Sequence, residues 1–236
     1  MEQLLQQIIN GISLGSIYAL IALGYTMVYG IIKLINFAHS DVYMLGAFIG
    51  YVCMTKFNLG FLPSLIISMI LCTVAGVTIE KIAYKPLRNS TRIAVLITAI
   101  GVSLFIEYVT MAIAGPNVRS YPPVTGILAE SFVIGNINIT MQQVIILGIT
   151  VILMVLLQFI VKKTRIGKAM RAVSLDQDAA MLMGINVDTT ISFTFAIGSA
   201  LAGAAGIMVG LYYNSIDPLM GMLPGLKAFV AAVFGG

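Results

Sequence analysis

Long apolar runs alternate with short polar segments along the chain, and this pattern sets the expected architecture. Runs of the length that crosses a bilayer as a helix lie at about 8–30, 34–55, 62–81, 93–114, 141–161 and 189–212. None shows the ten-residue alternation of a membrane β-barrel strand. We therefore predict an all-α polytopic membrane bundle that forms a single domain over residues 1–236.

A seventh apolar run, at 226–234, begins after Pro224 and Gly225 and ends two residues before the last residue of the sequence. Nine residues are too few for a helix to cross a bilayer, which takes about 20. We therefore expect this run to be the start of a further span, and the sequence to be truncated within it.

Composition supports a membrane location. Hydrophobic residues make up 59% of the chain and charged residues only 9%, whereas soluble domains carry roughly a quarter charged residues. A water-facing surface cannot be covered with so few charges, which excludes a soluble fold. Cys53 and Cys72 both fall inside apolar runs, so we expect them to act as small buried side chains.

Basic residues are concentrated in two of the loops between the spans. The two loops carry nine of them, namely Lys81, Lys85, Arg88 and Arg92 in one and Lys162, Lys163, Arg165, Lys168 and Arg171 in the other. The loops on the opposite face carry only Lys56 and Arg119. Because lysine and arginine favour the cytoplasmic side, residues 81–92 and 162–188 are predicted to be cytoplasmic. The N-terminus and the loop 115–140 are then predicted to lie outside.

The predicted outside loop, 115–140, is the largest in the chain. Its later part alternates in polarity around Gly135-Asn136, which predicts a tight hairpin turn. The loop is either a docking ledge for an external partner or a lid over the bundle.

Small residues recur every four positions in the last full span. Gly198, Ala202, Gly206 and Gly210 would share one face of a helix, and such a face allows close helix–helix packing. The partner is either another helix of this chain or a second subunit.

Polar side chains gather at the start of the second span, where Asn36, His39 and Asp41 lie within six residues. They either line or gate the inward end of a translocation pathway, or form an interfacial turn in which Asn36 and Asp41 cap helix ends and a carbonyl satisfies His39. A zinc site is not expected, because His39 is the only histidine. Glu107 lies within a span and is predicted to make an interior polar contact, whereas Glu80 is predicted to be a solvated neighbour of Lys81 and Lys85.

The second basic loop contains signals for a short helix over about 175–183. Ser174 and Gln177 have capping-box spacing, Gly184 suits the C-terminal end, and Asp188 is a candidate N-cap for the next span. The expected apolar face consists of Leu175, Ala179, Leu182 and Met183. Such a helix could lie flat on the membrane or sit in a groove of a partner protein.

Asp178-Ala179-Ala180 followed by Gly184 resembles the E-A-A-x-x-x-G loop of permeases from binding-protein-dependent ABC importers, with aspartate in place of the glutamate. The longer blocks at 35–47, 164–173 and 214–236 resemble the branched-chain amino-acid permeases of the LivH/LivM type. In that family this loop docks into the ATPase subunit. The resemblance therefore implies an ATPase-coupling role for Arg165, Gly167, Arg171, Leu175, Asp178, Ala179, Ala180, Leu182, Met183 and Gly184.

The resemblance implies a permease subunit, not an enzyme, that takes up branched-chain amino acids through the bacterial inner membrane. Urea and short-chain amide permeases share this framework and remain the alternative. The implied partners are a second related permease, two cytoplasmic ATP-binding subunits and an extracytoplasmic solute-binding protein. The sequence contains no G-x-x-x-x-G-K-[ST] loop. ATP would therefore be used by a partner, and no cofactor is expected on this chain.

Overall fold

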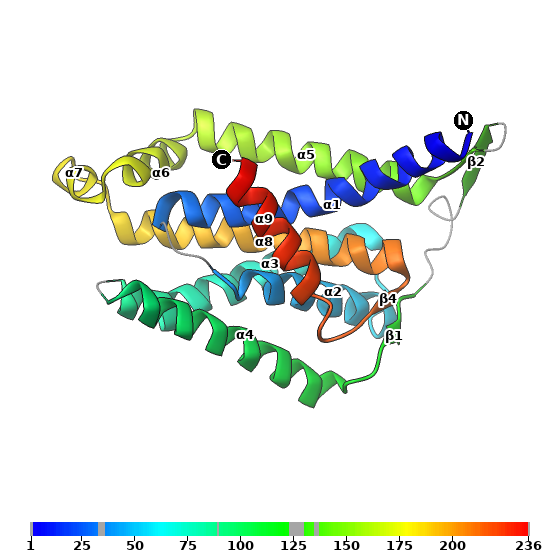
Figure 1. Cartoon of the computed structure of the whole chain (residues 1–236), viewed down its shortest axis with the longest axis horizontal. Helices are drawn as coiled ribbons and strands as arrows, with labels where there is room; N and C mark the ends of the chain where they lie inside the picture. The colour runs from blue at the N-terminus through cyan, green and yellow to red at the C-terminus, as the bar shows by residue number, and fades with distance from the viewer. Residues whose placement is uncertain (1, 33–35, 89, 123–129, 135–136, 236) are drawn as a thin grey trace.

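The computed structural model describes residues 2–32, 36–88, 90–122, 130–134 and 137–235, and most of them are helical (Figure 1). The helices are α1 (Glu2–Ile32), α2 (His39–Thr55), α3 (Phe61–Ile79), η1 (Glu80–Tyr84), η2 (Lys85–Leu87), α4 (Arg92–Ala114), α5 (Met141–Lys163), α6 (Arg165–Leu175), α7 (Gln177–Leu182), α8 (Val187–Tyr213) and α9 (Met222–Gly235). The strands are β1 (Arg119–Ser120), β2 (Ser131–Ile134), β3 (Ile137–Thr140) and β4 (Ser215–Ile216).

The predicted polytopic bundle is confirmed. Within the described residues, five helical segments are long and apolar enough to cross a membrane, and they correspond to α1, α3 with its continuation to Leu87, α4, α5 and α8. The run predicted at 34–55 is the 17-residue helix α2. Its first residues, His39, Ser40 and Asp41, are buried. α2 therefore begins inside the bundle.

α8 forms the centre of the bundle, and α1, α2 and α3 pack around it (Figure 1). Its small residues permit this packing, and at the closest approach a Cβ atom on Gly206 would collide with the neighbouring helix. Gly198 lies against Gly24 of α1, and Gly206 lies against the backbone of Tyr43 in α2. The small-residue face of α8 therefore packs within this chain, which was one of the two predicted partners.

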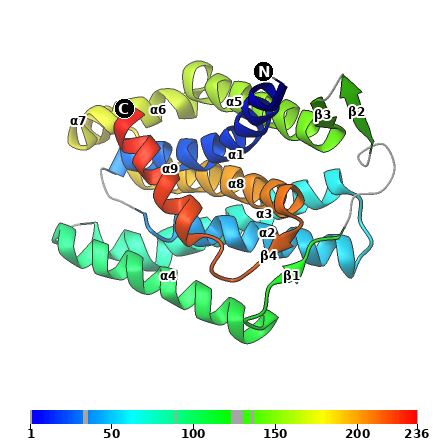
Figure 2. The same cartoon turned by 45° about the vertical axis from the view of Figure 1, so that its right-hand side comes forward.

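The two basic loops lie at the same end of the bundle. Asp188, at the start of α8, forms an ion pair with Lys85 at 2.7 Å and a second with Arg88, so the loops are in direct contact. The N-terminus and the strands lie at the opposite end (Figures 1 and 2). The predicted grouping of the loops is thus confirmed.

The loop 115–140 is partly folded onto that opposite end. β1 pairs with β4 in antiparallel register, and Tyr121 is buried against Gly50 and Gly210. β2 and β3 form the antiparallel pair expected of the predicted hairpin, while its turn, Gly135-Asn136, lies outside the described residues. The first part of the loop, which contains β1 and Tyr121, therefore covers this end of the bundle as a lid would.

α9 begins four residues earlier than the apolar run 226–234 suggested. Pro224 occupies its first turn, where the missing N–H of proline costs no hydrogen bond. α9 runs obliquely across α1 (Figure 2). Its start packs against the start of α2, because Gly221 and Gly225 both contact Ser40.

Candidate functional site

Two helices, and not the single helix predicted over 175–183, follow α5. α6 continues to Leu175, and α7 starts at Gln177. The N-cap of α7 is Asp176, whose side chain accepts hydrogen bonds from the backbone N–H groups of Asp178 and Ala179 at 2.9 and 3.0 Å. The Ser174 hydroxyl instead donates to the carbonyl of Arg171 within α6. The predicted Ser174–Gln177 capping box is therefore wrong, because α6 extends over its first residue.

α6 is held tightly against the end of α5. Thr164 caps it by accepting from the N–H of Gly167, and Gly167 lies so close to the carbonyls of Ile160 and Val161 that a Cβ atom would collide with them. The guanidinium of Arg171 donates to the carbonyl of Val161. Arg171 and Gly167 thus fix the direction in which α6 leaves the bundle.

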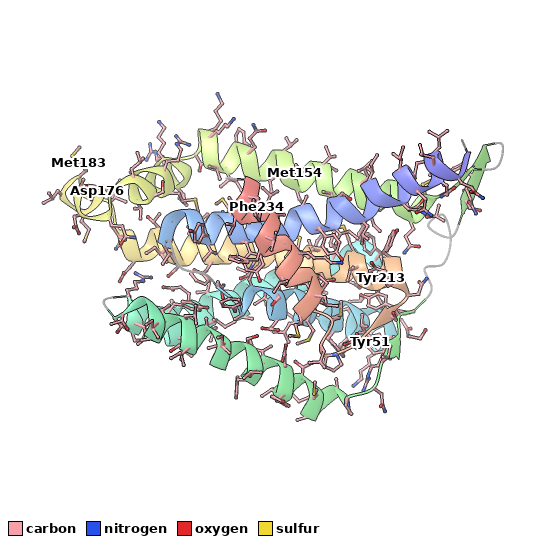
Figure 3. All side chains as sticks on the ribbon, in the orientation of Figure 1. Tyr51, Met154, Asp176, Met183, Tyr213 and Phe234 are labelled. Atoms are coloured by element: carbon pink, nitrogen blue, oxygen red, sulfur yellow. The ribbon has the colours of Figure 1, made fainter. Side chains whose placement is uncertain are left out.

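α7 forms the tip of the molecule at this end. Leu175, Leu182 and Met183 are 85%, 89% and 83% exposed, whereas Ala180 is buried. Figure 3 shows Asp176 and Met183 at the outermost part of this tip. Most of the predicted apolar face therefore has no partner among the described residues, and Ala180 provides the contact with the bundle. We call Leu175, Leu182 and Met183 the α7 tip.

The chain returns from α7 to α8 through a tight turn. Gly184 has φ of +79°, a conformation that residues with a Cβ rarely adopt. Asn186, and not the predicted Asp188, is the N-cap of α8, because its side chain accepts from the N–H of Thr189. Asp188 lies in the first turn of α8, where it is available for the ion pairs with Lys85 and Arg88.

Glu80 differs most from its prediction. It is fully buried and not a solvated neighbour of Lys81 and Lys85. The Arg88 guanidinium donates to its Oε1 atom and also to Asp188, and the Ser192 hydroxyl donates to its Oε2 atom at 2.6 Å. Both oxygens of the Glu80 carboxylate therefore have a partner, namely Arg88, which follows η2, and Ser192 of α8. Sequence reasoning missed this because the partners come from separate parts of the chain.

The polar residues at the start of α2 are all buried, but they do not cap it. The N-cap position is Ala38, which has no side-chain cap. The side chain of Asn36 instead accepts a hydrogen bond from the Tyr84 hydroxyl at 2.7 Å. The ring of His39 packs edge-on against Tyr25, with 4.7 Å between the ring centroids. The capping interpretation of Asn36 and Asp41 is therefore wrong.

Asp41 of α2 lies next to Glu107 of α4, and Asp41 is buried whereas Glu107 is half-buried. The side chain of Asp41 is buried and lies next to Ser103 and Glu107 of α4, and its Oδ2 atom has no hydrogen-bond partner among the described residues. Asp41 is therefore the polar group that Glu107 contacts. Ser103 was missed, although it shares a face of α4 with Glu107 at the i, i+4 spacing.

A cavity of about 340 Å³ adjoins this pair. It is lined by Tyr25, Phe37, Ser40, Ile100, Ser103, Leu104, Glu107, Met222, Gly225, Leu226 and Phe229. Two further cavities, of about 530 and 490 Å³, lie between α2, α3 and α4 and between α1 and α5, and their linings are almost entirely apolar. Of these three cavities, the one beside Glu107 offers charged and hydroxyl groups to a ligand.

The family model and the individual relatives that match this chain all point to the same family. Residues 7–236 match the family described as "Branched-chain amino acid transport system / permease component". Over 98% of its length, the chain is 40% identical to the high-affinity branched-chain amino acid transport system permease protein LivH of Salmonella typhimurium and 41% identical to LivH of Escherichia coli K12. It is 40% identical over the same share to the permease protein BraD of Pseudomonas aeruginosa, and 79% of each relative is covered.

No solved structure matches the chain significantly. The family and the relatives nevertheless agree along almost the whole sequence, and the helical bundle provides the membrane spans that a permease requires. The chain belongs to the family of permease components of branched-chain amino acid transport systems.

Proposed function

We propose that this chain is the membrane-spanning permease subunit of an ABC importer that takes up branched-chain amino acids, with ATP hydrolysed on a separate subunit. The observation that carries the proposal is the 40% identity over 98% of the chain to permease proteins of such transport systems. The multi-pass bundle and its cavity with a carboxylate in a mainly apolar wall are the features that a pathway for an apolar amino acid needs.

In this proposal the chain pairs with a second, related permease, two cytoplasmic ATP-binding subunits and an extracytoplasmic solute-binding protein. The membrane is the bacterial inner membrane. The end of the bundle that carries the nine clustered basic residues faces the cytoplasm, and the N-terminus faces out. ATP belongs to the partner subunits, and this chain itself carries no cofactor.

The α7 tip is the proposed contact with the ATPase. Three large apolar side chains that are each more than four-fifths exposed are costly in water and favour burial in a groove of a partner. Because Gly167 and Arg171 fix α6 against α5, a push on α7 would be transmitted to α5 and α8 as a rigid-body movement. Residues 165–184 would in this way couple ATP hydrolysis to the transport cycle.

The contact is tested with Leu182→Glu, which adds a charge to the α7 tip without disturbing the interior. We expect ATPase copurification and uptake of labelled leucine to be lost while membrane insertion is unchanged, since burying an unpaired charge costs several kcal/mol. Phe57→Glu, at an exposed apolar position before α3, is the matched control and should retain both. Normal copurification with Leu182→Glu would instead favour a helix that lies flat on the membrane.

A further inference from the structure

The cavity beside Glu107 lies at mid-depth in the bundle. Ser103 is the central residue of α4, Arg92–Ala114, and Glu107 lies one turn further along. α2 and α9 both start at this level, where Ser40 contacts Gly221 and Gly225. The wall of the cavity is therefore formed by the first residues of α2 and α9 and by the side of α4. A cavity of this kind can hold a small solute within the membrane.

The carboxylates at this cavity have no cationic partner among the residues that the structure describes. Among the described residues, the ion pairs involve Glu80 and Asp188, and neither Asp41 nor Glu107 takes part in one. Asp41 is buried with one oxygen unpartnered and lies against Glu107, which itself lines the cavity. Burying such groups without a counter-charge is costly, and a cationic ligand would offset the cost.

The rest of the lining is mainly apolar. Aliphatic and aromatic side chains from α4, α9 and the segment before α2 form most of the wall, namely Phe37, Ile100, Leu104, Met222, Leu226 and Phe229. A ligand that fits this cavity has a cationic group at one end and a hydrocarbon group at the other. An ammonium group offers three hydrogen-bond donors, and the Glu107 carboxylate and the Ser103 hydroxyl in the cavity wall can accept from it.

We propose that Asp41 and Glu107 bind the ammonium group of an amino acid in transit, while the apolar wall of the 340 Å³ cavity holds its branched side chain. This inference rests on the proposed function and names the subsite for one part of the solute. Glu107 makes the direct contact, and Asp41 adds the second negative charge from behind it.

The test places a reporter in the cavity wall of the complete transporter. Leu104→Cys introduces a thiol there, and the rate of its labelling by a maleimide is measured with leucine or with 4-methyl-2-oxopentanoate, which has the same carbon skeleton and no ammonium group. We expect leucine to slow labelling about tenfold and the oxo acid to have little effect, since a charged site rejects an analogue that lacks its partner group. Adding Glu107→Gln should abolish the protection.

Glu130→Gln, which removes an exposed carboxylate outside the spans, is the matched control and should keep the protection by leucine. Equal protection by leucine and the oxo acid would overturn the inference, and this comparison does not depend on the folding of any Glu107 variant. Persistent protection in Glu107→Gln would overturn it as well. Leucine uptake by the parent transporter is measured in parallel, because its absence would overturn the proposed function and this inference together.

Discussion

The bundle contains two pairs of acidic residues, and the two members of each pair come from different helices. One pair has a basic partner and the other has none among the described residues. Glu80 and Asp188 lie at the basic end, where the guanidinium of Arg88 bridges them. Asp41 and Glu107 lie at mid-depth next to a cavity, and neither has an ion-pair partner among the described residues. All four side chains are carboxylates, but only Glu80 and Asp188 have their negative charge balanced by a basic side chain among the described residues.

Burial does not distinguish the two pairs. Glu80 is 0% exposed and Asp41 is 1% exposed. The difference is that Glu80 receives a guanidinium and a hydroxyl, whereas Asp41 retains an unpartnered oxygen. A buried carboxylate that loses its cation destabilises the fold, whereas Asp41, behind the Glu107 that lines a cavity, is suited to a ligand that brings the charge.

The largest effect should come from removing the cation of the compensated pair. Arg88→Met would leave Glu80 buried and unpaired, which costs about 3–5 kcal/mol. We expect the variant to lose most of its folded population on heating, as measured by size-exclusion chromatography of heated membrane extracts. The double variant Glu80→Gln with Arg88→Met should recover much of the loss. If Arg88→Met alone were as stable as the parent, the structural role of this pair would be wrong.

A different outcome is expected when a charge is removed from the uncompensated pair. Asp41→Asn should leave thermal stability equal or higher, because no buried ion pair is broken. Uptake of labelled leucine should nevertheless fall about tenfold, equivalent to about 1.4 kcal/mol, if the charge helps to bind the solute. Assembly with the ATPase is measured on the same sample. Loss of assembly, or unchanged uptake, would contradict the distinction between the pairs.

The smallest effect is expected at the exposed edge of the compensated pair. Lys85 and Asp188 are 50% and 51% exposed and lie 2.7 Å apart. Exposed ion pairs contribute about 0–1 kcal/mol, so Lys85→Met should shift the unfolding transition only slightly, and less at high salt. The same heated-extract assay measures it. A loss as large as that of Arg88→Met would show that Lys85, and not Arg88, compensates the acids.

The sequence predicted the spans well because their signal is local. An apolar run of about 20 residues forms a membrane helix wherever it occurs, and α3, α4, α5 and α8 follow the predicted runs closely. The division between α6 and α7 was not predictable in the same way. Ser174 and Asp176 are both good capping residues, and the contacts of α6 with the end of α5 decide between them.

For the candidate site, single residues were predictable but their partners were not. Asp41 and Glu107 stand out because ionisable residues are rare in apolar runs. Their meeting depends on how α2 and α4 are rotated about their axes, which no local pattern specifies. The burial of Glu80 depends in the same way on Arg88 and Ser192, which reach it from other elements.

Uptake of branched-chain amino acids through this chain, driven by ATP hydrolysed on a partner subunit, is the proposed function. Its most direct test is uptake of labelled leucine by vesicles that contain the complete transporter, the solute-binding protein and ATP inside. We expect uptake to stop when ATP, the binding protein or this chain is omitted, and to be suppressed by unlabelled isoleucine or valine. Uptake that continues without ATP, or a preference for urea over leucine, would contradict it.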